Sequence, residues 1–291
     1  MKPSGVLVLD KAAGATSHDI VQQARRRLQT REIGHAGTLD PMATGVLVLA
    51  IGEATKLVPY LTAAEKSYEA TVRLGVTTRT LDADSEVSES VAVPDDWRER
   101  LPLALTIERA RTEQIPPIFS AIRQEGVRAH VLARRGETVT FAPRAVRVLR
   151  LDVTFASDDA KCVALSLDVS KGYYVRSLAR DLAASLGTVA HLTSLRRTQS
   201  GCFSLSEACL VTEPDLAGRI LPLGLAAARA LPSARLTPRG CEDARNGRSV
   251  AREDFIVTAR GISAWLDEEA HLIAVGEIVA EGGGRVIRGF R

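Results

Sequence analysis

The amino-acid sequence predicts an α+β fold, and three features of the chain lead to this prediction. Segments with the apolar runs or the alternation of β-strands outnumber segments with helical periodicity. Helices do not follow every strand, which argues against a doubly wound architecture. The 291 residues, 45% of them hydrophobic and 25% charged, suffice for a buried core and suggest about two domains. We expect one domain over residues 1–230 and a second over residues 231–291.

The chain is predicted to begin with a strand, a helix, a loop and a second strand. Residues 5–10 form an apolar run of strand length. Thr16 and Ser17 are N-cap candidates for a helix with one apolar side. That side consists of Ile20, Val21, Ala24 and Leu28. Residues 34–45 are rich in turn formers and predict a loop, which leads into an apolar strand over residues 46–51.

A helical segment over residues 53–61 and a strand over residues 66–75 are expected next. The strand alternates between apolar and polar residues, as a strand with one buried face does. Its apolar face consists of Tyr68, Ala70, Val72 and Leu74. Acidic and polar residues over 82–96 predict a connecting loop that leads into a short helix.

The second half of the first domain is predicted to contain two helices and a pair of strands. Residues 127–135 are expected to form a helix that stops at Gly136. A second helical stripe starts at Val175 and ends at Gly187. The apolar residues of the strands between them are Leu149, Leu151, Val153 and Phe155, then Val163, Leu165, Leu167 and Val169. Residues 213–230 are helical or linking, and short strands over 255–259, 271–281 and 285–290 suggest a small β-rich appendage.

Several classes of protein are excluded by what the sequence lacks. No apolar run approaches the roughly 20 residues of a membrane helix, and the apolar stretch at residues 5–9 is cut short by Asp10 and Lys11. The four cysteines are far apart and form no C-x-x-C pair, and no phosphate-binding glycine loop is present. We therefore expect a cytoplasmic protein without membrane insertion, metal or nucleotide cofactor.

Positive charge is concentrated in the middle of a chain whose net charge is only +3. Seven arginines face two glutamates over residues 121–150, and five basic residues face one aspartate over residues 171–200. Such segments are typical of a surface that holds a polyanion. Solvated helix faces explain them equally well, so charge alone leaves both interpretations open.

One short loop contains the residues that indicate a catalytic function. Asp40 by itself is an ordinary turn residue before Pro41. The surrounding segment, Gly-His-Ala-Gly-Thr-Leu-Asp-Pro-Met-Ala-Thr-Gly over residues 34–45, resembles the catalytic motif of the TruB-type pseudouridine synthases, the bacterial tRNA pseudouridine-55 synthases. Further blocks resemble this family in the same order, over residues 5–11, 66–68, 114–117, 171–176 and 195–197. The resemblance covers about residues 5–210, and the C-terminal part more weakly resembles a small PUA RNA-binding module.

Three positions depart from the family pattern. Ala12 follows Lys11 where the family usually has proline. Arg123 and His130 stand where lysine and tyrosine are common. None of these changes removes a group that the chemistry needs, but they affect loop rigidity and contacts with the RNA arm.

The resemblance implies a pseudouridine synthase fold, with a mixed, largely antiparallel central sheet flanked by helices and a small C-terminal PUA-like β-barrel. It implies isomerisation of a T-loop uridine of tRNA, in which the C1′–N1 bond breaks, the base turns and a C1′–C5 bond forms. This reaction uses no cofactor. Asp40 matches the essential carboxylate, which either attacks C1′ or abstracts a proton from C2′, and the sequence leaves both routes open.

The resemblance also assigns residues around an everted base. Arg176 would pair with Asp40 and favour its ionised form. Tyr68, which a place in the core would otherwise explain, would stack on the base. His35 would contact RNA near the position that the nucleotide leaves. The remaining walls would be formed by Tyr174 and Leu195.

The basic segment over about residues 114–150 resembles the thumb-like insertion with which this family clasps RNA. It would close over the phosphates of the T-arm and supply affinity without reading bases. Its candidate contacts are Arg123, Arg128, Arg134 and Arg135.

Two other functions fit part of the sequence. A non-catalytic tRNA chaperone would use the same basic segments and the same C-terminal module. A guide-RNA-dependent relative of the archaeal and eukaryotic type would share the motif around Asp40 but lack the thumb-like segment. Because the motif and the segment are both present, we expect a monomeric enzyme that acts on tRNA without a guide RNA.

Overall fold

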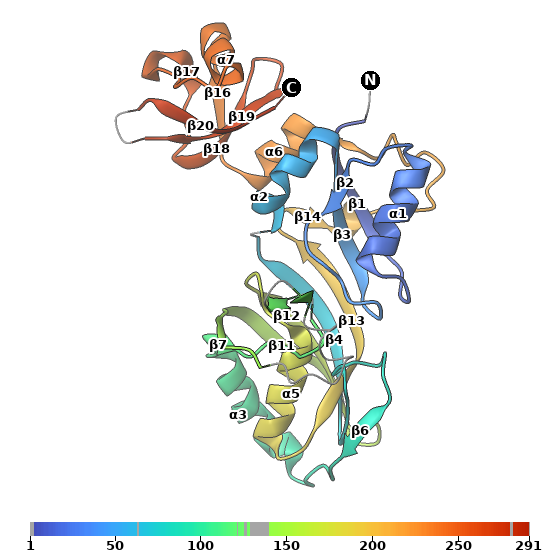
Figure 1. The fold of residues 1–291 in the computed structure, drawn as a ribbon. Coiled ribbons are helices and arrows are strands. Elements are labelled where there is room, and N and C mark those ends of the chain that lie inside the picture. The colour runs from blue at the N-terminus through green and yellow to red at the C-terminus, as the bar shows by residue number, and fades with distance from the viewer. Residues whose placement is uncertain are drawn as a thin grey trace.

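The computed structural model describes residues 3–62, 64–120, 122–124, 127–128, 140–279 and 282–290, without the side chains of 123–124 and 127–128. Within these residues, nine strands form a central sheet, seven of them in the order β11-β12-β4-β13-β3-β1-β15 (Figure 1). Their bounds are β1 Gly5–Lys11, β3 Thr44–Ile51, β4 Lys66–Leu74, β11 Val148–Ser157, β12 Cys162–Val169, β13 Ala190–Ser200 and β15 Leu221–Pro222. The two others are β2 (Ile33–His35), which pairs with β3, and β14 (Phe203–Ser204), which pairs with β13.

The sheet is mixed and largely antiparallel, as the resemblance implied. β13 runs parallel to β3, with Arg196 opposite Thr44. The other neighbouring pairs in the sheet are antiparallel. Since β13 joins β4 to β3, the first residues of β4 lie close to the loop that enters β3, although 20 or more residues separate them in the chain. The candidate site forms at this junction.

Helices cover both faces of the sheet near its N-terminal strands. α1 (Ser17–Arg27) starts with a capping box between Thr16 and Asp19, which stabilises the helix by about 1 kcal/mol. It packs its predicted apolar side on one face of β1 and β3. The opposite face is covered by η1 (Gly52–Leu57), α2 (Val58–Thr62) and α6 (Leu223–Ala230) (Figure 1).

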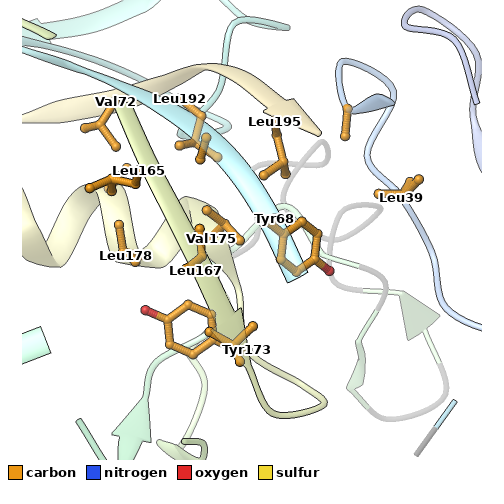
Figure 2. Close-up of a cluster of buried hydrophobic side chains, with 14 of the residues drawn as sticks. Leu39, Tyr68, Val72, Leu165, Leu167, Tyr173, Val175, Leu178, Leu192 and Leu195 are labelled. Atoms are coloured by element: carbon orange, nitrogen blue, oxygen red, sulfur yellow. The ribbon is translucent and has the colours of Figure 1, made fainter. Parts of the chain in front are cut away.

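The other half of the sheet packs against two helices. α3 (Trp97–Arg109) packs on α5 (Val175–Leu186) and on β11, and α5 packs on β4 and β13. Figure 2 shows Val175 and Leu178 of α5 together with Leu165 and Leu167 of β12. α5 ends at Gly187, whose φ of +80° is the left-handed cap that the sequence predicted. The predicted face of β4 is buried, whereas its neighbours Glu69 and Arg73 are exposed.

Two predicted loops contain regular structure. β2 occupies the beginning of the 34–45 loop, where it adds to β3. The predicted loop over 82–96 contains β6 (Val87–Ser90), which pairs with β5 (Val76–Thr78), and the helix after it has 13 residues and is not short. β6 is exposed along its whole length. A strand without a buried face has no alternation to reveal it.

The predicted helix over residues 127–135 is wrong at its start. Arg123–Gln124 (β8) and Val127–Arg128 (β9) pair as antiparallel strands, and a backbone paired in this way cannot make the bonds of a helix. Residues 129–135 lie outside the described residues. This hairpin belongs to the insertion. At the root of the insertion, where it leaves and rejoins the rest of the chain, β7 (Glu113–Gln114) pairs with β10 (Arg144–Ala145). β11 already belongs to the central sheet, so the insertion ends before residue 148.

The C-terminal residues form a separate five-stranded sheet in the order β17-β16-β18-β19-β20. The predicted strands correspond to β17 (Phe255–Val257), β19 (Leu272–Ile278) and β20 (Gly284–Gly289). The sequence reading missed β16 (Ser233–Leu236), β18 (Gly261–Leu266) and α7 (Pro238–Arg245). In the part of the chain that the structure describes, β17 and β20 do not pair with each other, so the strands do not close into a barrel.

A tryptophan organises the core of this second sheet. Trp265 is fully buried and meets Phe255 edge to face, with ring centroids 5.2 Å apart. A side chain at Gly276 would put its Cβ 2.2 Å from the indole, which explains glycine there. The sheet packs on the first part of the chain through α6, and Lys56 donates to the carbonyl of Gly289. None of the helices in the described residues has the length and apolarity needed to cross a lipid bilayer.

Candidate active site

A cavity of about 510 Å³ opens at the junction of β3, β4 and β13. Asp40 contributes to it from the loop before β3, Tyr68 from β4 and Leu195 from β13. Tyr174 and Arg176 complete it from the start of α5. Tyr68 and Leu195 lie at one end of the apolar cluster under the sheet, close to Leu39 (Figure 2). Five of the six residues expected to surround a base therefore line one cavity.

Asp40 and Arg176 form a two-point ion pair at the wall of this cavity. Nε of Arg176 lies 2.8 Å from Oδ2 of Asp40, and Nη2 donates to Oδ1 at 2.9 Å. The Arg176 side chain is only 5% exposed, whereas the Asp40 side chain is 30% exposed. The hydrogen bond from Nη2 and the close approach of Nε fix both the charge and the orientation of the carboxylate. The carboxylate thus remains accessible from the cavity, and the buried Arg176 side chain fixes its orientation.

A second aspartate, Asp82, lies next to Arg176, and the sequence did not indicate its role. Asp82 is 4% exposed, and its Oδ2 lies 3.6 Å from Nε of Arg176. Nη1 of the arginine donates to the carbonyl of Thr80 at 2.9 Å. The hydroxyls of Thr78 and Thr80 donate to the carbonyl and the carboxylate of Asp82. Asp82 was expected to lie in a connecting loop, and only an acidic pair with Asp84 marked it in the sequence.

The charges around Asp40 act in opposite directions on its pKa. Burial raises the pKa of the Asp40 carboxyl above its ordinary value, and the positive charge of Arg176 counteracts this increase. The negative charge of Asp82 raises the pKa of Asp40 further. Arg176 is therefore the group that favours the ionised carboxylate, and this agrees with its predicted role.

The loop that carries Asp40 is held on one side by a buried lysine. Nζ of Lys11 donates to the carbonyls of Ala12, Ala15 and Pro41 at 2.7–3.1 Å. Burial lowers the pKa of Lys11, although the charge of Asp40 opposes this effect. Because the lysine amine contacts the main chain at residue 12, the substitution of alanine for proline there leaves this bridge intact.

Arg197 holds the loop on the other side. It is fully buried and donates to the carbonyls of Gly37, Thr38 and Val46. Gly45, with a φ of +102°, passes so close to the main chain of Arg197 that a Cβ would lie 2.2 Å from its carbonyl oxygen. Gly45 is thus needed for close passage past β13, and the sequence did not indicate the role of Arg197.

Comparison with known proteins identifies the family. Residues 25–175 match the family described as "TruB family pseudouridylate synthase (N terminal domain)", and residues 176–223 match "tRNA pseudouridylate synthase B C-terminal domain". The chain belongs to the TruB family of pseudouridylate synthases.

Relatives in this family resemble the chain over most of its length. A tRNA pseudouridine synthase B of Mycobacterium sp. (strain KMS) is 46% identical over 253 residues, covering 85% of this chain and 84% of the relative. The protein of the same name from Mycobacterium tuberculosis (strain ATCC 25618 / H37Rv) is 44% identical over 93% of this chain and 91% of its own. The TruB resemblance is therefore confirmed.

Solved structures confirm the fold. A Cbf5-Nop10-Gar1 complex contains a chain with a TM-score of 0.75 and 25% identity, which covers 99% of this chain and 84% of its own. A chain of an H/ACA RNP bound to a substrate RNA containing 2′-deoxyuridine has a TM-score of 0.71 at 24% identity, over 99% and 85% of the two chains. The central part of this TruB family member thus has the pseudouridine synthase fold.

The remaining predicted residues are placed less fully. His35 lies half-buried on β2 and is not among the residues that line the cavity. Arg123 and Arg128 belong to β8 and β9, but their side chains lie outside the described residues, as do His130, Arg134 and Arg135 altogether. Their contacts with RNA stay predictions.

Part of the positive charge counted in the sequence is neutralised by neighbouring acids. Arg147 pairs with Glu65 at 3.1 Å, and Arg150 pairs with Asp168 at 2.7 Å across β11 and β12. Arg196 pairs with Asp10 at 2.7 Å. The charge that these described residues leave for a ligand is therefore smaller than the sequence suggests.

Proposed function

We propose that this chain isomerises a uridine of tRNA to pseudouridine at position 55 in the T-loop, with Asp40 as the catalytic carboxylate. The observation that carries this proposal is the ion pair of Asp40 with Arg176 at the wall of a cavity large enough for a nucleoside. The relatives named tRNA pseudouridine synthase B support the choice of tRNA.

The reaction replaces one glycosidic bond with another and transfers one proton. The C1′–N1 bond breaks, the freed uracil turns, and C5 bonds to C1′. The proton on C5 is then lost and N1 gains one, so atoms and charge balance without a cofactor. Asp40 begins the reaction by attack at C1′, which forms an ester that breaks when C5 bonds to C1′, or by removal of a proton from C2′, which returns to C2′ when C5 adds to the glycal. Both routes need the ionised form of Asp40 and release it again. Arg176 supplies that form and its direction.

The apolar walls would hold the base while it turns. A uridine must leave its stack to reach Asp40, and the ring of Tyr68 offers a flat surface for it. Tyr68 and Leu195 are less than 10% exposed, so neither side chain moves freely. Tyr174 would close the cavity from the side of α5. His35 would contact RNA outside the cavity.

Basic side chains beside the cavity suit the phosphates of RNA. Its lining includes Lys66, Arg144, Lys171 and Arg197. Burial, together with the positive charges of Arg197 and Lys171, lowers the pKa of Lys66 to about 8. Among the described residues, no carboxylate forms an ion pair with Lys171. A phosphate group would relieve the repulsion among these cations.

The rest of the chain would bind tRNA outside the cavity. The insertion that starts near residue 114 would close over the T-arm with Arg123, Arg128, Arg134 and Arg135. Residues 231–291 would act as a PUA-like RNA-binding domain next to a catalytic domain over 1–230. We expect a cytoplasmic monomer that needs no guide RNA, because the T-arm itself would supply the shape to be recognised.

Replacing Asp82 with Asn is expected to lower the single-turnover rate about tenfold, because Arg176 loses one of the groups that fix it. It should also move the acid limb of the pH–rate profile to lower pH, since the charge of Asp82 raises the pKa of Asp40. The measurement is pseudouridine formation between pH 5 and 8, and Asp95→Asn, an exposed aspartate, serves as control. An unmoved acid limb would contradict the charge coupling.

Replacing Lys171 with Gln is expected to weaken tRNA binding and to reduce its dependence on salt by about one released ion. The affinity would be measured at several salt concentrations. The matched control is Lys161→Gln, which removes a lysine just before the opposite end of β12. Equal salt slopes for both variants would mean that Lys171 does not contact phosphate.

The decisive experiment is incubation of the pure protein with an unmodified tRNA transcript and no additives, followed by mapping of pseudouridine. A new pseudouridine at position 55 alone supports the proposal. Modification only in the presence of an added guide RNA would favour a guide-dependent enzyme. Tight binding without any modification would favour a tRNA chaperone.

A further inference from the structure

Gln114, at the root of the insertion, makes two opposite hydrogen bonds to one residue of the cavity wall. Its Nε2 donates to the carbonyl of Tyr174 at 3.1 Å, and the N–H of Tyr174 donates to its Oε1 at 2.8 Å. Gln114 is 2% exposed, so water does not replace these bonds. The side-chain amide thus pairs with Tyr174 as a neighbouring strand would.

Tyr174 needs such a partner because it lies where extended backbone meets the start of helix α5. It is the N-cap of α5, with an extended backbone (φ −109°, ψ 113°) and no side-chain cap. The N–H of an N-cap residue has no partner within the helix. Gln114 satisfies this N–H and fixes the direction in which the chain enters α5.

The segment after Gln114 holds the same region at further points. The carbonyl of Ile115 accepts from Oγ of Ser177 at 2.9 Å and from Nη2 of Arg180 at 3.0 Å. The first two turns of α5 are therefore attached along one side to Gln114 and Ile115.

This attachment lies next to the catalytic pair, Asp40 and Arg176. Tyr174 lines the cavity together with Asp40, and Arg176 follows it by two residues. A shift of the backbone at Tyr174 would move its ring along the cavity wall. The bonds of Gln114 therefore bear on the geometry of the site, although its amide is engaged with main chain.

We propose that Gln114 is a positioning residue, which acts through Tyr174 to fix the wall against which the everted base is held. This proposal rests on the proposed function of the site. It assigns to the root of the insertion a role in the rate of reaction that is separate from any contact of the insertion with phosphate.

Gln114→Met tests the proposal, since methionine has a similar length but cannot make either hydrogen bond. The single-turnover rate is expected to fall about 10- to 100-fold, because small displacements in an active site have effects of this size. The affinity for tRNA should change little. The control is Gln199→Met, at an exposed glutamine whose amide donates to the carbonyl of Gly201. Equal rates for Gln114→Met and wild type would overturn the proposal.

A double-mutant cycle with Tyr174→Ala separates positioning from general stabilisation of the fold. If Gln114 acts through Tyr174, Gln114→Met should have little further effect on the rate in the Tyr174→Ala background. Additive losses would overturn the proposal.

A spectroscopic measurement decides the question even if the protein shows no activity. Labelling with 3-fluorotyrosine gives ¹⁹F signals for four tyrosines, and Tyr174→Phe assigns one of them. In Gln114→Met the Tyr174 signal should shift or broaden, while that of Tyr60 on α2 stays unchanged. An unchanged Tyr174 signal would overturn the positioning role. Absence of pseudouridine in the wild type would instead contradict the proposed function alone.

Discussion

Replacing Asp40 with Asn is expected to lower pseudouridine formation at least about 10³-fold, since the reaction loses its nucleophile or base. The amide oxygen of asparagine can still accept from Arg176, so the loop and the cavity should keep their shape. The affinity for tRNA should therefore stay close to that of the wild type. Tritium release from C5-labelled uridine in tRNA measures the reaction, and a filter-binding assay measures the affinity.

The matched control for this variant is Asp95→Asn, which removes a carboxylate on the surface before α3. It should leave the rate and the affinity unchanged. Persistent tritium release in Asp40→Asn would show that another group starts the reaction. A large loss of affinity would show instead that the loop had changed its structure.

Replacing Arg176 with Lys is expected to lower the rate about 100-fold at unchanged net charge, because an ammonium group cannot replace a planar fork. Arg176 contacts both oxygens of Asp40, the carbonyl of Thr80 and the carboxylate of Asp82. A lysine can satisfy only part of this set. A rate close to that of the wild type would mean that only the charge at residue 176 matters.

Arg176→Met tests the electrostatic part of the same role. Without the guanidinium, Asp40 and Asp82 face each other as like charges, so the pKa of Asp40 should rise further. Activity requires the ionised carboxylate and is lost as the pH falls through this pKa. The acid limb of the pH–rate profile should therefore move to higher pH, opposite to its movement in Asp82→Asn. Circular dichroism would verify the fold, since Asp82 loses its partner in a buried place.

The elements that the sequence predicted best are those whose apolar residues repeat with a single period. The alternation around Tyr68 defined β4 and its buried face, and the stripe from Val175 defined α5. Prediction failed where no such period exists, as in the exposed strand β6 and in the paired segments at Arg123 and Val127. In these segments the backbone is fixed by partners across the sheet, and short polar sequences do not identify such partners.

The candidate site was predictable to the extent that its residues lie in recognisable motifs. Asp40, Tyr68, Tyr174, Arg176 and Leu195 were expected to surround one base, and they line one cavity. Gln114 begins one of the blocks that resemble the family, and Asp82 begins a predicted loop. Their roles arise from hydrogen bonds and ion pairs to residues far away in the chain, which neither periodicity nor turn chemistry indicates.

The sequence by itself determined which segments could bury an apolar face and which loop carried the chemical groups. It did so because backbone preferences and periodicity act between residues close together in the chain. The tertiary structure alone decided that Asp40, Asp82 and Arg176 meet, and that Gln114 supports Tyr174. These contacts depend on β13 joining β3 to β4 and on the insertion returning to α5. Burial then strengthens them, because the charges and amides are removed from water where the elements pack.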